Sequence, residues 1–125
     1  MYELPEYDWL YLERSAEAVV TRCLGELPEL LREAASRVPV IYRKWHPDVE
    51  QGNWDAVELL GEYFSYEEDR VSEQNGPVAL YLGAIQLFCD EEGVPYEDEV
   101  RITFLHELGH HFGWDEDDLH DRGLG

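Results

Sequence analysis

The chain has 125 residues, of which 44% are hydrophobic, and this composition suits one globular domain over residues 1–125 rather than a disordered chain. Acidic residues outnumber Lys and Arg by 29 to 9, so the formal net charge is −20. This balance excludes the basic surface that nucleic acid or an anionic membrane requires, and we expect neither as a partner. We expect a monomer, because charges of one sign keep copies of the chain apart.

The chain is expected to begin with an aromatic-rich, irregular arm over residues 1–12, which contains Pro5. The start of this arm lacks the basic region of a signal peptide, so we expect a cytoplasmic protein. Ser15 can cap a helix, and apolar residues then recur at helical spacing over 14–37. Pro28 suits the first turn of a second helical segment, so this stretch is predicted to be a two-part amphipathic helix.

The middle of the chain alternates apolar runs with loops. Three of these runs predict strands, over residues 38–45, 59–66 and 78–82. Between the first two runs, residues 46–53 are predicted to form a loop that leaves His46 in solvent. Helices are then predicted over 83–89 and 96–112, with Gly113 ending the second. This order predicts an α+β fold with an N-terminal helix, a small mixed sheet and a C-terminal helix.

The last predicted helix carries the pattern H-E-x-x-H over residues 106–110. An α-helix advances about 100° per residue, so His106 and His110 lie on one face, about one turn apart. This spacing allows two imidazoles to bind one metal ion, and their bond length of about 2.0–2.1 Å suits Zn²⁺. Glu107 lies beside the pair, where its carboxylate can act as a base toward water at the metal. The pattern therefore predicts Zn²⁺ as cofactor, two histidine ligands and one catalytic glutamate.

The opposite side of this helix is apolar, which predicts that it packs into the core. The residues of this predicted core face are Phe104, Leu105, Leu108 and Phe112. The two histidines therefore line one edge of a helix whose other face is buried. We expect the additional histidine, His111, to support the metal ligands or the fold and not to bind the metal itself.

A catalytic zinc site needs a third protein ligand beside the two histidines. In the longer pattern H-E-x-x-H-x-x-G-x-x-H, a glycine turns the chain so that the last residue reaches the metal. Gly113 occupies the glycine position here, and Glu116 stands at the last position. A carboxylate can replace the imidazole, so Glu116 is the predicted ligand. Asp115, Asp117 and His120 are near enough in sequence to compete.

The run F-L-H-E-L-G-H-H-F-G-W-D-E-D-D-L over residues 104–119 resembles the small bacterial zincin-like metallopeptidases. The resemblance is strong over 101–124 and weaker over 59–61 and 78–82. It implies a compact, zincin-like α+β fold, a zinc site and peptidase activity. That family usually carries an aspartate at the position of Glu116.

These observations favour a zinc-dependent hydrolase of peptide bonds that acts on a peptide or protein. Glu107 is predicted to accept a proton from water and to pass it to the leaving amine. The peptide is expected to add as an extra strand beside residues 78–82. One alternative is a metal-binding or protein-interaction module of zincin fold with little or no turnover. A second alternative, an acidic mimic of nucleic acid, requires an exposed stripe of acidic residues.

Overall fold

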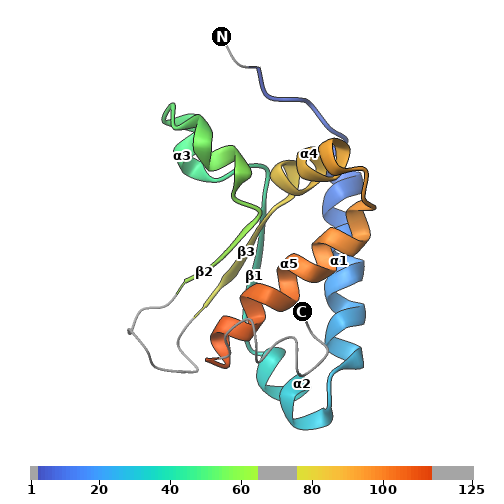
Figure 1. Cartoon of the computed structure of the whole chain (residues 1–125). Coiled ribbons are helices and arrows are strands. Elements are labelled where there is room, and N and C mark those ends of the chain that lie inside the picture. The colour runs from blue at the N-terminus through green and yellow to red at the C-terminus, as the bar shows by residue number, and fades with distance from the viewer. Residues whose placement is uncertain (1–2, 65–75, 114–125) are drawn as a thin grey trace.

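The computed structural model describes residues 3–64 and 76–113, and it confirms the predicted α+β fold (Figure 1). The helices of these described residues are α1 (Trp9–Glu26), α2 (Glu29–Ala35), α3 (Pro47–Glu50), α4 (Leu82–Glu92), α5 (Tyr96–His111) and the 3-10 helix η1 (Trp54–Glu58). Three strands form the sheet: β1 (Val40–Arg43), β2 (Gly61–Tyr63) and β3 (Val78–Tyr81).

The first helix begins earlier than predicted. α1 begins at Trp9, so the irregular arm is shorter than residues 1–12 and Ser15 lies inside the helix. The side chain of Asp8 caps α1 by accepting a hydrogen bond from the backbone N–H of Tyr11. Aspartate and serine are both good N-caps, and the sequence offers one of each within this segment. The break before α2 agrees with the prediction, with Pro28 as the N-cap of α2.

The sheet has the order β1-β3-β2, so β3 is its central strand. β1 pairs parallel with β3, and β2 pairs antiparallel with it, with Gly61 opposite Leu80. The expectation that a peptide adds beside residues 78–82 is therefore wrong, because both edges of β3 already pair with strands. In the described part of the chain, β2 forms an edge of this sheet.

Helix α5 crosses one face of the sheet obliquely beside β2 and β3, and α1 packs against α5 (Figure 1). Leu80 and Val78 of β3 are fully buried in the same apolar cluster as Phe104 of α5. The predicted core face of α5 is confirmed by the burial of Phe104, Leu105 and Leu108, while Phe112 is half-buried. This packing fixes the orientation of α5 and leaves the opposite edge of the helix for polar side chains.

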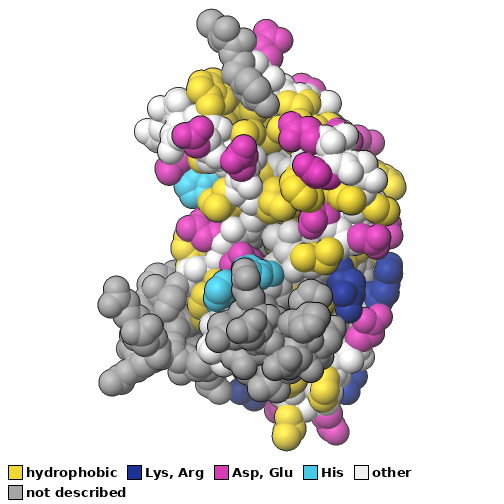
Figure 2. All heavy atoms as spheres, viewed as in Figure 1, with side chains coloured by type: hydrophobic (Ala, Val, Ile, Leu, Met, Phe, Trp, Pro, Cys, Tyr) yellow, Lys and Arg dark blue, Asp and Glu magenta, His cyan; other side chains and the backbone are white. Residues whose placement is uncertain are grey.

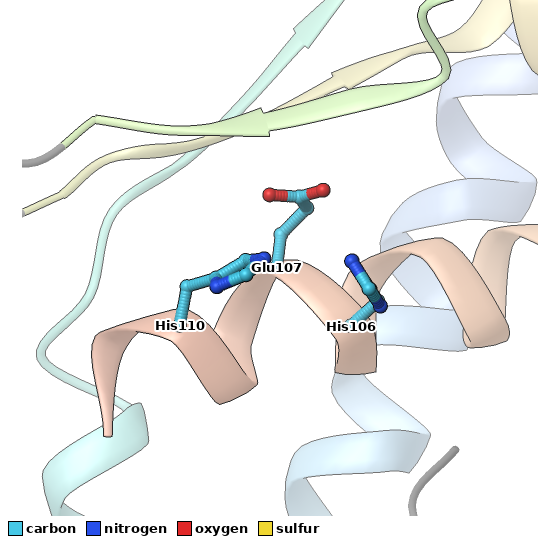
Figure 3. Close-up of side chains that lie close together, drawn as sticks. All are labelled: His106, Glu107 and His110. Atoms are coloured by element: carbon cyan, nitrogen blue, oxygen red, sulfur yellow. The ribbon is translucent and has the colours of Figure 1, made fainter. Parts of the chain in front are cut away.

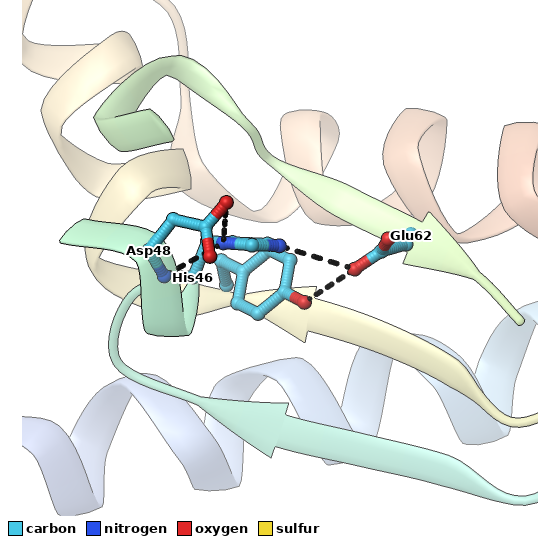
Figure 4. A network of polar contacts seen from close by, with 4 residues as sticks. His46, Asp48 and Glu62 are labelled. Carbon is cyan, nitrogen blue, oxygen red and sulfur yellow. Dashed lines mark hydrogen bonds and ion pairs between the residues drawn. The ribbon is translucent and has the colours of Figure 1, made fainter. Parts of the chain in front are cut away.

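His46 is not in solvent as predicted, because its side chain is only 16% exposed. It caps α3: the ring Nδ1 accepts a hydrogen bond of 3.0 Å from the backbone N–H of Asp48. Its Nε2 lies 3.5 Å from Glu62 Oε1, and Tyr81 donates its hydroxyl to the same oxygen over 2.9 Å (Figure 4). Burial and this carboxylate raise the pKa of Tyr81. The network joins β3, β2 and the start of α3.

The surface shows no single acidic stripe on the face drawn in Figure 2, where acidic side chains are dispersed among hydrophobic ones. This distribution gives no support to the acidic mimic. Histidine side chains reach the surface on the same face. Among the helices of the described residues, none is both long enough and apolar enough to cross a membrane.

Candidate metal centre

The helix that carries the motif has favourable charges at its start and a glycine beyond its end. Glu97, Asp98 and Glu99 lie in the first turn of α5, where negative charge stabilises the positive end of the helix dipole. At the other end, the N–H of Gly113 donates to the carbonyl of His110 over 3.0 Å. Gly113 has φ +72°, a left-handed conformation that glycine adopts without strain, as expected for its predicted role in ending the helix.

The structure brings His106, Glu107 and His110 together on α5. Each of the three residues offers one potential ligand atom, and these three atoms all lie within 4.8 Å of one another. The imidazole centroids of the two histidines are 5.0 Å apart, and Glu107 points from the helix toward β2 between them (Figure 3). His110 is exposed, whereas His106 and Glu107 are half-buried. The cluster is therefore open on the side of His110.

The donor atoms of this cluster fit a zinc ion. Two ligands that each lie about 2.1 Å from one ion are at most about 4.2 Å apart. The 4.8 Å limit that encloses the cluster is only slightly larger, so small side-chain rotations would bring both histidines to bonding distance. Imidazole nitrogen and carboxylate oxygen are also the donor types that zinc accepts.

Glu107 lies in an environment that favours its protonated form. Burial raises the pKa of its carboxyl group above the ordinary value, the nearby His106 opposes this rise, and Glu62 adds to it. A raised pKa brings a carboxyl group nearer to neutral pH, where it can both accept and donate a proton. The environment of Glu107 is therefore suited to acid–base chemistry.

Gly61 allows β2 to lie directly against α5 at this cluster. A Cβ atom at Gly61 would be 2.7 Å from Thr103 Cγ2, 3.1 Å from the carbonyl oxygen of Ala79 and 3.3 Å from Glu107 Cγ. In the sequence, this glycine only weakens the prediction of a strand. Its importance depends on contacts with α5, more than forty residues later in the chain, and no local pattern signals them.

His111 is not part of the cluster of His106, Glu107 and His110, and it is only 6% exposed. Its ring Nδ1 and the hydroxyl of Tyr63 share a hydrogen bond of 3.0 Å, and burial lowers the pKa of the imidazole. This contact ties the end of α5 to β2, which is consistent with the structural role expected for His111.

The predicted third ligand, Glu116, lies outside the described residues. The same is true of the competing candidates Asp115, Asp117 and His120. The third ligand therefore stays a prediction from the spacing after Gly113.

Comparison with protein families agrees with the fold and the motif. The family model for zincin-like metallopeptidases matches residues 35–125, which include all three strands, α3 to α5 and the H-E-x-x-H pattern. The chain belongs to the zincin-like metallopeptidase family. No curated protein matches it.

Proposed function

We propose that the protein is a zinc-dependent hydrolase of peptide bonds. The observation that carries this proposal is the convergence of His106, Glu107 and His110 on one helix beside an edge strand. Membership of the zincin-like metallopeptidase family supports a peptide or protein as substrate. A site that only held a structural metal would not need the carboxylate of Glu107 beside the two imidazoles.

In this proposal, His106 and His110 hold the zinc ion and Glu116 completes the set of protein ligands. When bound, zinc would act as a Lewis acid toward water and toward the carbonyl group of the scissile bond. Glu107 accepts a proton from the attacking water as its oxygen bonds to the carbonyl carbon. The same carboxyl group then donates the proton to the amide nitrogen as the C–N bond breaks.

The substrate is proposed to add as a strand beside β2 rather than beside β3. On either side of β2, the N–H of Tyr81 in β3 donates to the carbonyl of Leu60, and the N–H of Phe64 donates to the carbonyl of Pro77, just before β3. Because backbone groups alternate in direction along an antiparallel strand, those of Gly61 point away from β3. An extended peptide that pairs there would lie next to Glu107, whose Cγ is close to Gly61.

Cleavage of a peptide library with and without a chelator tests the proposal. We expect cleavage by the zinc-loaded protein, loss of cleavage with chelator and recovery when zinc is restored. His106→Ala should lose zinc, measured as metal per chain after dialysis. Zinc binding at parent stoichiometry in that variant would exclude His106 as a ligand. Zinc binding by the parent with no cleavage of any library peptide would instead favour the non-enzymatic module.

A further inference from the structure

A groove with a volume of about 490 Å³ lies between α4 and the segment that leads from η1 into β2. Its apolar lining consists of Val57, Leu60, Ala84, Leu87 and Phe88, and its acidic lining consists of Glu58, Glu91 and Glu92. Val57 and Leu87 are half-buried and belong to neither core cluster of the described residues. These two side chains therefore add apolar surface that the described core clusters do not include, next to three negative charges.

One residue of the groove lining is the sequence neighbour of the glycine that faces the metal-site cluster. Leu60 lines the groove and directly precedes Gly61, the residue of β2 that packs against Glu107. A strand rises by about 3.3 Å per residue, so an extended peptide beside Gly61 needs one or two more residues to reach the groove. In Figure 2, acidic and hydrophobic side chains lie together over α4, on the face where histidine side chains reach the surface.

The charges of the groove are not balanced by the fold. Within residues 3–64 and 76–113, Glu58, Glu91 and Glu92 make no ion pair and no side-chain hydrogen bond. Glu91 and Glu92 also end α4, whose last turn contains no basic residue. Negative side chains at the negative end of a helix dipole are unfavourable for the helix. A positively charged ligand in the groove would offset this repulsion.

We propose that this groove binds a basic, partly apolar segment of the peptide substrate, within a few residues of the bond that is cleaved. The inference rests on the proposed function and adds the class of substrate to it. The groove is complementary to such a segment in both respects, because its lining contains both apolar and acidic side chains. A second copy of this chain is a poor occupant, since its net charge of −20 would be repelled.

Peptide binding in the presence of chelator tests the groove separately from hydrolysis. The probe is a fluorescein-labelled peptide of alternating Lys and Leu, measured by fluorescence anisotropy against a counterpart of alternating Glu and Leu. The test variant combines Glu58→Gln, Glu91→Gln and Glu92→Gln. The matched control removes the same number of charges from exposed positions on α1 and α2, with Glu17→Gln, Glu26→Gln and Glu29→Gln.

We expect the parent to bind the basic peptide and not the acidic one, with weaker binding at high salt. The groove variant should bind the basic peptide about tenfold more weakly, because three charge contacts are lost, while the control stays within about twofold of the parent. The groove variant should also melt at a higher temperature than the parent, which shows that it folds. Equal weakening in the two variants, or no binding by the parent, would overturn the inference.

The outcome for the proposed function is read from the cleavage experiment. Groove-dependent binding without cleavage of any library peptide would refute the hydrolase and leave the docking groove supported. Zinc-dependent cleavage without a preference for basic residues near the cut bond would refute the groove and leave the hydrolase supported.

Discussion

The close approach of β2 to α5 makes Gly61→Ala a sensitive test of how the site is built. The added Cβ would lie 2.7 Å from Thr103 Cγ2 and 3.1 Å from the carbonyl oxygen of Ala79, both too close for unstrained contact. Overpacking of this kind costs about 1–3 kcal/mol, and the rigid backbone oxygen places the expected loss of unfolding free energy in the upper half of that range. Urea denaturation followed by circular dichroism measures this loss. The substitution should also lower hydrolysis, because its third contact is with Glu107 Cγ at 3.3 Å.

A double-mutant cycle identifies the clashing atom. Thr103→Ser removes Cγ2, the nearest of the three atoms, and by itself costs about 1 kcal/mol for a buried methyl group. Combined with Gly61→Ala, it should destabilise by less than the sum of the two changes, with a coupling of about 1 kcal/mol. The rescue should be partial, because the carbonyl oxygen of Ala79 stays in place. A Gly61→Ala variant as stable as the parent, or strict additivity in the cycle, would refute the proposed contact between β2 and α5.

Further variants test the surroundings of the site. Tyr63→Phe removes the hydroxyl that shares a hydrogen bond with His111, and urea unfolding should show that the free energy of unfolding falls by about 1 kcal/mol. Unchanged stability would mean that this bond contributes nothing. For Glu107, burial raises the folded-state pKa above the unfolded value, so the metal-free parent loses stability as pH rises between the two values. In the presence of chelator, Glu107→Gln should therefore have a higher melting temperature than the parent at pH 7, and this difference should vanish near pH 4. A difference that does not change with pH would contradict the raised pKa. Glu116→Ala should weaken zinc binding in a chelator competition, whereas Asp117→Ala should not. The opposite result would assign the third ligand to Asp117 instead.

The parts of the fold that sequence patterns predict best are those set by local spacing. The boundaries of α5 agree with the prediction to within one residue, and three of the four residues of its predicted core face are buried. These features, like the left-handed Gly113 just beyond the helix, follow from helical periodicity and glycine chemistry. The break between α1 and α2 is likewise a local consequence of Pro28. The convergence of His106 and His110 follows from their four-residue spacing alone.

The features that sequence patterns miss depend on contacts between distant segments. In the order β1-β3-β2, the strand that comes last in the sequence lies between the two earlier strands. This order decides which of the described strands have a free edge for a peptide. The burial of His46 depends on Glu62, which β2 brings beside it. The requirement for glycine at position 61 depends on Thr103 of α5.

The central claim is that Glu107 is the base of a zinc-dependent hydrolase. Its most direct test compares the zinc-loaded parent with zinc-loaded Glu107→Gln on one peptide that the parent cleaves. The amide preserves the shape of the side chain but cannot accept the proton, so the variant should bind zinc with parent stoichiometry and lose cleavage by at least about a hundredfold. Cleavage by the zinc-loaded variant at the parent rate would contradict the claim.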